Sequence, residues 1–546
     1  MKQYISLVSA LALLLLVQAG SGAPGDLIWQ QTLGGPGGEE WGYSLDATPD
    51  GGLLVTGIAY STDANVTGAR GNGDLWVVRL DPSGNLLWDH AFGGNESDYG
   101  LSVRATEDGG SVIIGTSVSM TGDVTGYHGN GDLWVIRLSS SGESVWKKVY
   151  GGNLTDEGGD IIQTADGGFL AAGYTMSDGG DATGHRGGGD LWLIRLGSDG
   201  SVLWQKTYGG SGRESGSSLI ATADGGYVIT GNTYSTDGDV TASHGSSDVW
   251  VVKTDSAGNL LWQKTYGGSR LDWGHSLVEL PGGDLVVAGV TASADGDVSL
   301  NHGAGDIWLI RLTPGGDLVW EKTYGGSFSD NVWKIHPAPT GGVYLSGETF
   351  SVDGDFAGNH GDADLLISEI DGNGTLLWYK TYGGQNYESG SWVRPLPDGT
   401  LTACGTTRSM DGDVRNGKGE GDLWVVKVEG GAGMVQPPAP AADVSVDPAV
   451  TPVNSSPGTL PAESVSPVST TLLPAPGMDT PPSDPDGDGL FEDLNGNGKA
   501  DMQDPSIFFT EYDWIVLHYP VEILDFNTNG AIDLGDVNEL FLEVSG

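Results

Sequence analysis

The C-terminal region contains two segments whose side chains have the types and spacing of calcium ligands. Residues 493–504 read D-x-N-x-N-G-x-x-D-x-x-D, and residues 525–536 repeat the pattern 32 residues later. Calcium loops of this length take oxygen ligands from positions 1, 3, 5, 7, 9 and 12, the seventh through a backbone carbonyl, with Gly at position 6. The predicted Ca²⁺ ligands are Asp493, Asn495, Asn497, Lys499, Asp501, Asp504, Asp525, Asn527, Asn529, Ala531, Asp533 and Asp536.

Each loop leads into a short apolar segment, 506–517 or 537–544, which reads as a helix. Paired units of one loop and one following helix resemble a dockerin, and the resemblance covers about 60 residues. It implies calcium-dependent docking to a cohesin-like domain and folding coupled to the ion. Many cellulosomal dockerins carry small hydroxyl residues at loop positions 10 and 11, where this chain has Met502, Gln503, Leu534 and Gly535. The acidic stretch 484–488 before the first loop is either a third ion site or a solvated charge run.

A second set of polar residues repeats along the first 430 positions. A string like G-D-L-W recurs every 58 residues, with its Asp at Asp74, Asp132, Asp190, Asp248, Asp306, Asp364 and Asp422. Thirty-four residues earlier stands an acid: Glu40, Asp98, Asp156, Glu214, Asp272, Asp330 or Glu388. Nine residues earlier stands Asn65, Asp123, Asp181, Asp239, Asp297, Asp355 or Asp413. Four residues earlier stands Arg70, His128, Arg186, His244, His302, His360 or Lys418.

These repeated positions have two interpretations. In the structural one, acid and base pair between loops and the Asp side chains cap turns. In the functional one, each unit holds a calcium ion in a loop such as 237–239, because alternate oxygen ligands suit calcium. We favour the structural interpretation, since a feature present in every unit usually maintains the fold.

Departures from the repeat are therefore the better candidates for a binding site. The segment after each recurring Gly pair varies most between units, and its distinctive residues are Trp41, Tyr99, Arg213, Arg270, Trp273, His275, Phe328, Trp333, Tyr387 and Trp392. Exposed aromatic residues there would stack on sugar rings or contact a partner, whereas buried ones would pack between units. No Ser/His/Asp set, nucleophile elbow or carboxylate pair stands out, so we assign no catalytic residue.

The elements that carry these residues are short strands. One unit reads as strands at 43–48, 53–59, 75–80 and 86–92, joined by Gly-containing turns, which is typical of a propeller blade. A second Trp ends a run like G-N-L-L-W in each unit and is followed by a Gly pair, at Trp29, Trp88, Trp146, Trp204, Trp262, Trp320 and Trp378. The seventh unit lacks its fourth strand, and the spare strand at 26–33 completes it. We therefore predict an all-β, seven-bladed propeller of four-stranded blades over residues 26–431, closed by its first strand.

The run from Leu80 to Trp88 resembles the tryptophan-docking motif of quinoprotein-type propellers, in which each Trp packs against the neighbouring blade. The resemblance implies architecture only. Quinoprotein dehydrogenases have eight blades and often a vicinal cysteine pair. This chain has one cysteine, Cys404, which we interpret as a small buried strand residue.

Composition limits the possible partners, the cellular location and the domain organisation. The 546 residues include 93 Gly and carry a formal net charge of -48, which argues against nucleic acid and anionic membrane as partners. Residues 1–25 read as a secretory signal peptide and no other segment is apolar enough to span a membrane, so we expect a secreted or cell-surface protein. Residues 432–483 are a Pro/Ser/Thr-rich linker, and 484–546 form the dockerin-like calcium-binding domain, a small α EF-hand-like unit.

Three functions fit this organisation. The first is a non-catalytic binding or scaffold protein whose propeller presents a face to a polysaccharide, surface glycan or protein. The second is a secreted carbohydrate-active enzyme, a glycoside hydrolase or polysaccharide lyase, on a dockerin tether; it requires one asymmetric pocket holding carboxylates at the separation that glycosidases use. The third is a structural surface-layer component. Fold alone does not decide among them. We favour the first, because the blades are nearly uniform and no catalytic constellation is visible in the sequence.

Overall fold

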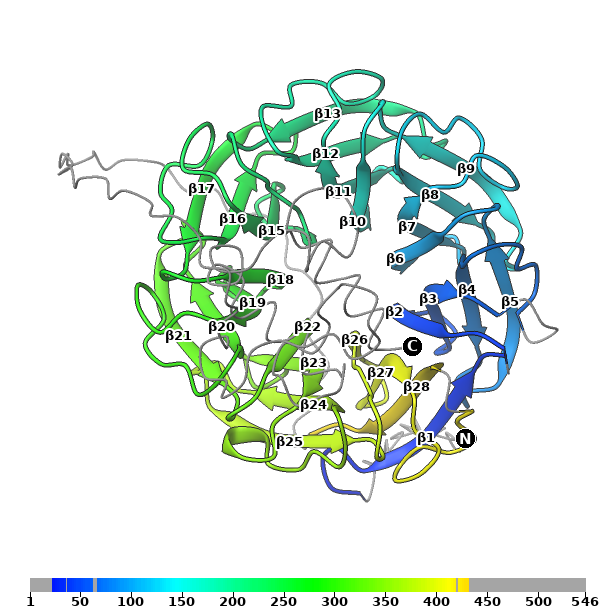
Figure 1. Ribbon diagram of the computed structural model, residues 1–546, viewed down its shortest axis with the longest axis vertical. Coiled ribbons are helices and arrows are strands. Elements are labelled where there is room, and N and C mark those ends of the chain that lie inside the picture. The colour runs from blue at the N-terminus through cyan, green and yellow to red at the C-terminus, as the bar shows by residue number, and fades with distance from the viewer. Residues whose placement is uncertain (1–21, 36, 62–65, 419–420, 432–546) are drawn as a thin grey trace, which may run out of the picture.

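The chain forms seven four-stranded antiparallel sheets arranged around a central axis (Figure 1). The computed structural model describes residues 22–35, 37–61, 66–418 and 421–431. The prediction of an all-β, seven-bladed propeller with four-stranded blades is confirmed. In the described part of the chain the only helix is a 3₁₀ turn at Gly354–Phe356. That part contains no helix long and apolar enough to cross a membrane.

Each blade runs from an inner strand beside the axis to an outer strand at the rim. Blade 1 comprises β2 (Glu40–Ala47), β3 (Leu53–Ala59), β4 (Asp74–Leu80) and β5 (Leu86–Phe92). Blade 2 comprises β6 (Asp98–Ala105), β7 (Ser111–Ser117), β8 (Asp132–Leu138) and β9 (Ser144–Tyr150). Blade 3 comprises β10 (Asp156–Gln163), β11 (Phe169–Thr175), β12 (Asp190–Leu196) and β13 (Val202–Tyr208). Blade 4 comprises β14 (Ser218–Ala221), β15 (Tyr227–Thr233), β16 (Asp248–Thr254) and β17 (Leu260–Tyr266).

The remaining blades follow the same order. Blade 5 comprises β18 (Asp272–Glu279), β19 (Leu285–Thr291), β20 (Asp306–Leu312) and β21 (Leu318–Tyr324). Blade 6 comprises β22 (Asp330–Pro337), β23 (Val343–Thr349), β24 (Asp364–Ile370) and β25 (Leu376–Tyr382). Blade 7 comprises β26 (Trp392–Pro395), β27 (Thr400–Thr407), β28 (Asp422–Glu429) and, as its outer strand, β1 (Leu27–Leu33).

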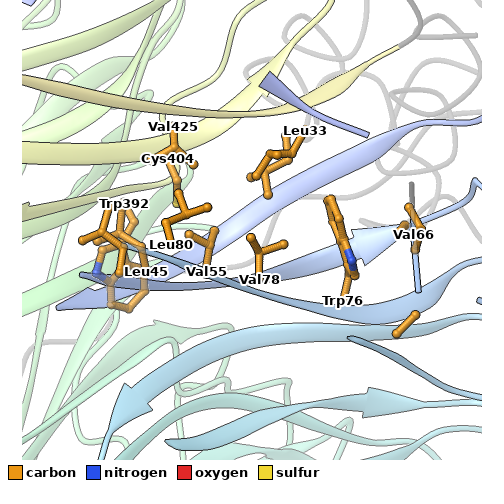
Figure 2. Packing of buried hydrophobic residues seen from close by; sticks show 14 of the residues in the cluster. Leu33, Leu45, Val55, Val66, Trp76, Val78, Leu80, Trp392, Cys404 and Val425 are labelled. Atoms are coloured by element: carbon orange, nitrogen blue, oxygen red, sulfur yellow. The ribbon is translucent and has the colours of Figure 1, made fainter. Parts of the chain in front are cut away.

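The first strand closes the ring, as predicted. β1 pairs antiparallel with β28, and Nε1 of Trp424 donates a hydrogen bond to the side-chain oxygen of Gln30 at 3.0 Å. The interface between blades 7 and 1 is a continuous apolar cluster in which Leu45 and Val55 of blade 1 pack with Cys404 and Val425 of blade 7 (Figure 2). Cys404 is therefore a buried strand residue, as the sequence indicated.

Each rim Trp packs on the following blade, which confirms the tryptophan-docking interpretation. Gly84, at the outer turn of blade 1, has φ 82°, and a Cβ there would lie 2.9 Å from the Trp29 ring of blade 7. Gly142 has the same relation to Trp88. Only glycine combines the positive φ with this close approach, so the turn and the docked ring require each other.

The repeated acids maintain the fold. The carboxylate of Asp98, which is fully buried, accepts hydrogen bonds from Ser117, from Ser119 at 2.7 Å and from the backbone N–H of Gly94 at 2.9 Å. Acid and base pair, as predicted: Arg70 contacts Asp123 of the next blade at 2.6 Å, whereas His302 contacts Asp306 of its own blade at 2.8 Å.

The calcium-per-blade alternative gains no support from the structure. Asp237 and Asp239, in the loop singled out from the sequence, accept hydrogen bonds from Ser211 N–H and from Arg186 and Gly209 N–H respectively. Among the described residues, no three His, Cys, Asp or Glu side chains form a group able to hold a metal ion. The predicted signal peptide, the linker and both predicted C-terminal calcium loops lie outside the described residues.

Candidate functional site: an asymmetric axial pocket

A bulge in the inner strand directs side chains toward the axis. In five blades the ladder between the inner strand and its neighbour shifts register at one residue, and these residues are Tyr43, Leu101, Gly159, His275 and Trp333. A bulge re-aims the extra residue relative to the regular alternation of a strand. All five residues line one cavity on the axis.

This axial pocket has a volume of about 650 Å³ and its wall differs from blade to blade. Of the ten candidate residues chosen from the sequence, seven line it: Trp41, Arg213, Trp273, His275, Trp333, Tyr387 and Trp392. Tyr99, Arg270 and Phe328 do not. Departures from the repeat thus gather around one pocket at most of these positions, and the pocket is asymmetric about the axis.

One wall is a stacked aromatic group from blades 5 and 6. The rings of His275 and Trp333 lie 4.7 Å apart and 9° from parallel, and Trp273 meets His275 edge-on at 6.4 Å. Nδ1 of His275 lies 2.7 Å from the carbonyl oxygen of Val332, so Nδ1 carries the proton and Nε2 is left as an acceptor. Burial lowers the pKa of His275 and keeps the ring neutral.

A buried carboxyl group holds this wall in place. Glu348, on β23, is 2% exposed and accepts hydrogen bonds from Nε1 of Trp333 at 2.8 Å and from Nδ2 of Asn331 at 3.0 Å. Burial raises the pKa of Glu348 to about 7, against the opposing effect of these two hydrogen bonds. Trp333 remains 41% exposed, so one face of a fixed ring is open to a ligand.

The part of the wall formed by blades 3 and 4 carries charge. The guanidinium of Arg213 lies 4.6 Å from the centre of the Tyr174 ring, and the Tyr174 hydroxyl lies 3.4 Å from the carboxylate of Glu157. Burial raises the pKa of Glu157, while Arg213 acts to lower it. This wall therefore offers one cation and one weakly acidic carboxyl group.

The next position along each inner strand, one residue after the bulge position, forms what we call the floor of the pocket. Four blades have Ser at this position, and three of these hydroxyls accept a hydrogen bond from a backbone N–H of the next blade: Ser44 from Val103, Ser218 from Leu277 and Ser276 from Ile335. The other three blades have Asp160, Lys334 and Trp392 there. The floor therefore departs from the repeat in blades 3, 6 and 7.

Asp160 takes over the hydrogen bond of the missing serine and adds a charge. It accepts the N–H of Leu219 at 3.2 Å, the hydroxyl of Ser102 at 2.7 Å and Nη2 of Arg104 at 2.7 Å. Burial opposes its ionisation, but Arg104 and Lys334 leave the pKa of Asp160 below its usual value. Asp160 is therefore an ionised carboxylate with both oxygens occupied.

Lys334 reaches across the axis from blade 6. Its Nζ lies 3.9 Å from Oδ2 of Asp160 in blade 3 and 4.0 Å from the centre of the Trp392 ring in blade 7. Burial lowers the pKa of Lys334 to about 8, Asp160 opposes that shift, and the cations Arg104 and Arg394 reinforce it. These contacts bridge the channel and give the pocket its floor.

A second layer lies beneath the floor. Nε of Arg394 lies 3.2 Å from Oδ1 of Asp46, and its Nη1 donates to Nε2 of His336 at 2.9 Å. Burial and the neighbouring Arg394 lower the pKa of His336 to about 3, so the imidazole is a neutral acceptor. Floor and second layer together contain the cations Arg104, Lys334 and Arg394 and the carboxylates Asp46 and Asp160.

Sequence reasoning missed several residues of this site. They are Tyr43, Glu157, Asp160, Tyr174, Lys334 and Glu348. For Asp160 and Lys334 the signal was present, because each replaces a serine at one register of the 58-residue repeat. Glu348 and Tyr174 lie on second strands, whose contribution to the axis became visible only in three dimensions.

Comparisons with known proteins identify no family. No protein-family profile matches the chain. The regulatory protein FlaEY of Caulobacter vibrioides is 25% identical over 435 residues, which cover 76% of this chain and 41% of that protein. The chain thus spans about two fifths of the length of this curated relative.

Several solved structures are similar to this chain over about three quarters of its length. A catalytically inactive virginiamycin B lyase from Staphylococcus aureus with quinupristin matches with a TM-score of 0.40 and 10% identity, over 73% of this chain and 99% of the other. YCF48 bound to a D1 peptide matches with a TM-score of 0.39 and 11% identity, over 76% and 99% respectively. Nothing about the ligands or activity of this chain follows from either match.

Proposed function

We propose that this protein is a non-catalytic binding protein whose axial pocket takes a glycan, presented outside the cell by a tether and a calcium-dependent docking module. The observation that carries the proposal is the pocket itself. Seven nearly uniform blades enclose one wall of fixed, partly exposed aromatic rings beside a charged floor. Sugar rings stack on such surfaces, while nearby polar groups orient the hydroxyls.

The geometry favours binding over catalysis. A glycosidase pair needs one protonated and one ionised carboxyl group free to act on the substrate. Both oxygens of Glu348 are occupied by Trp333 and Asn331, and those of Asp160 by Ser102, Arg104 and Leu219. Glu348 and Asp160 thus each have a structural role, which leaves Glu157 as the remaining carboxyl group on the pocket wall.

The first test is glycan binding by the full-length protein. We expect intrinsic Trp fluorescence to change on titration with oligosaccharides, and Trp333→Ala to weaken binding about 10- to 100-fold, the effect of losing one stacking platform. Phe328→Ala is the matched control, since Phe328 is 40% exposed on the same blade but does not line the pocket. Equal losses in both variants, or none in either, would contradict the proposal.

The docking module rests on the two loops at 493–504 and 525–536. We expect the full chain to bind at least two Ca²⁺ ions in calorimetry, and helix content to rise with binding in circular dichroism. Asp493→Ala and Asp525→Ala should each remove one ion, because position 1 ligands are indispensable in such loops. If the chain binds no ion at millimolar calcium, the proposed docking module is contradicted, and with it the cohesin-like partner.

A carbohydrate-active enzyme is the second candidate, and the raised pKa values of Glu157 and Glu348 in the pocket favour it. The enzyme would release new reducing ends or unsaturated products from a polysaccharide, and Glu348→Gln would abolish that release. If the unaltered protein binds a glycan but does not cleave it, the enzyme hypothesis is contradicted and the binding function stands.

A further inference from the structure

We infer that the ligand of the axial pocket carries a carboxylate, as in a uronic acid residue of a glycan, and that this carboxylate binds Nζ of Lys334 at the pocket floor. The inference rests on the proposed function and narrows it from glycans in general to acidic ones. Three observations lead to it: unused donors on Lys334, the excess of positive charge around the floor, and the position of the floor beneath the aromatic wall.

Lys334 has donors without acceptors. An ammonium group has three N–H donors, and among the described residues Nζ of Lys334 makes no hydrogen bond. The nearest carboxylate oxygen, on Asp160, is 3.9 Å away, and the other close neighbour is the face of Trp392. The residue is 9% exposed and lines the cavity, so a ligand in the pocket can reach these donors. Burying an ammonium group without hydrogen-bond acceptors costs free energy. A ligand with an acceptor atom in the pocket would supply the missing hydrogen bond.

The charged groups around the floor carry a net positive charge, which favours binding of an anion. Arg104, Lys334 and Arg394 outnumber Asp46 and Asp160 by one, in a chain whose net charge is -48. Each aspartate has a closer guanidinium partner than Lys334, because Arg104 pairs with Asp160 at 2.7 Å and Arg394 with Asp46 at 3.2 Å. A ligand carboxylate on Lys334 would neutralise the excess positive charge and leave both aspartate–arginine pairs intact.

The walls favour a sugar as the carrier of that carboxylate. A pyranose lying on the exposed face of Trp333 would have Nε2 of His275 nearby as an acceptor for hydroxyl groups. The bridge between Asp160 and Lys334 closes the channel below, so the site fits a chain end better than the middle of a continuous chain. The acidic surface of the protein would repel a glycan that carries many negative charges. We therefore expect the pocket to select a glycan with one uronic acid residue.

The test compares matched pairs of ligands on the full-length protein. Calorimetric titrations use oligosaccharides ending in glucuronate, galacturonate, mannuronate or guluronate, each beside its neutral methyl ester. We expect at least one acid to bind about 10- to 100-fold more tightly than its ester, the usual strength of one charge-assisted hydrogen bond.

Variants of Lys334 then locate the effect. Lys334→Met retains length and volume, and we expect it to bind acid and ester equally. Lys334→Arg keeps the charge and should retain most of the preference. Lys322→Met, which removes an exposed lysine on β21, the outer strand of blade 5, should leave the preference unchanged.

Each outcome decides one of the two proposals. Binding of esters and acids with equal affinity, sensitive to Trp333→Ala, would overturn the carboxylate inference and leave the glycan-binding function. A preference for the acid that survives in Lys334→Met would place the anion elsewhere and also overturn it. If no saccharide binds, while a peptide with a free C-terminal carboxylate does, the proposed function itself fails.

Discussion

Cys404 shows how completely a blade interface excludes solvent. It is the one cysteine of the chain, it has no exposed surface, and it packs with residues of both blade 7 and blade 1 (Figure 2). Burial raises the pKa of its thiol well above the usual range, so little reactive thiolate forms.

We therefore expect the folded protein to resist thiol-specific labelling at pH 8 and to take up one equivalent in guanidinium chloride. Absorbance of the released thiolate of Ellman's reagent measures both states. Stoichiometric labelling within minutes under native conditions would contradict the packing at this interface.

At the scale of the element, each contact between blades buries two carboxyl groups side by side. At the contact between blades 5 and 6, a Cβ on Gly325 would lie 2.4 Å from Oδ1 of Asp306 and 2.8 Å from Oδ2 of Asp330. Oδ1 of Asp306 has no hydrogen-bond partner among the described residues, whereas Asp330 accepts three hydrogen bonds. Burial raises the pKa of Asp330 to about 7, and the charge of Asp306 adds to this.

The sign of the resulting pH dependence follows from linkage. A carboxyl group with a raised pKa binds more protons in the folded than in the unfolded state, so its contribution to stability is lost as pH rises through the folded value. Glu40 and Asp272 also have pKa values raised to about 7, mainly by burial. We expect the urea midpoint of the propeller to fall between pH 5.5 and pH 8.5, measured by Trp fluorescence.

Asp306→Asn tests the same pair directly. Its amide would donate to Asp330 in place of a proton, so we expect it to stabilise the protein by on the order of 1 kcal/mol at pH 8.5 and to flatten the pH dependence. Asp284→Asn, at an ion pair with Arg311 in the same blade, is the control and should leave the slope in this range unchanged. An unaltered slope in Asp306→Asn would show that the pair does not carry it.

The elements were more predictable than the details of the site. The 58-residue step fixed blade number, strand order and ring closure, because those depend on periodic residues such as the rim Trp and the turn Gly. The bulges were not foreseen, although they aim Tyr43, His275 and Trp333 at the axis, since no residue type alone marks a bulge. The contact between Lys334 and Asp160 joins blades 6 and 3, and pairings across the axis leave no periodic trace in a sequence.

At the scale of the whole molecule, stability depends on the strand that closes the ring. Without β1, blade 7 would expose the edge of β28, and Gly84 would lose the ring of Trp29. We expect deletion of residues 26–33 to lower the urea midpoint strongly and to promote aggregation, measured by fluorescence and light scattering. Deleting eight residues of the predicted linker, 440–447, is the control of equal length and should alter neither.

The same closure governs the order in which the molecule is completed during synthesis. The side chains of Gln30 and Trp424, which bond across the seam, are 394 residues apart in the chain. Contacts of such long sequence separation form late and slowly, because a large loop must be closed first. A chain that emerges from its N-terminus thus carries β1 as an unmatched strand until six blades and most of the seventh have followed. Any partner that captures that strand in the meantime would stop the ring one strand short.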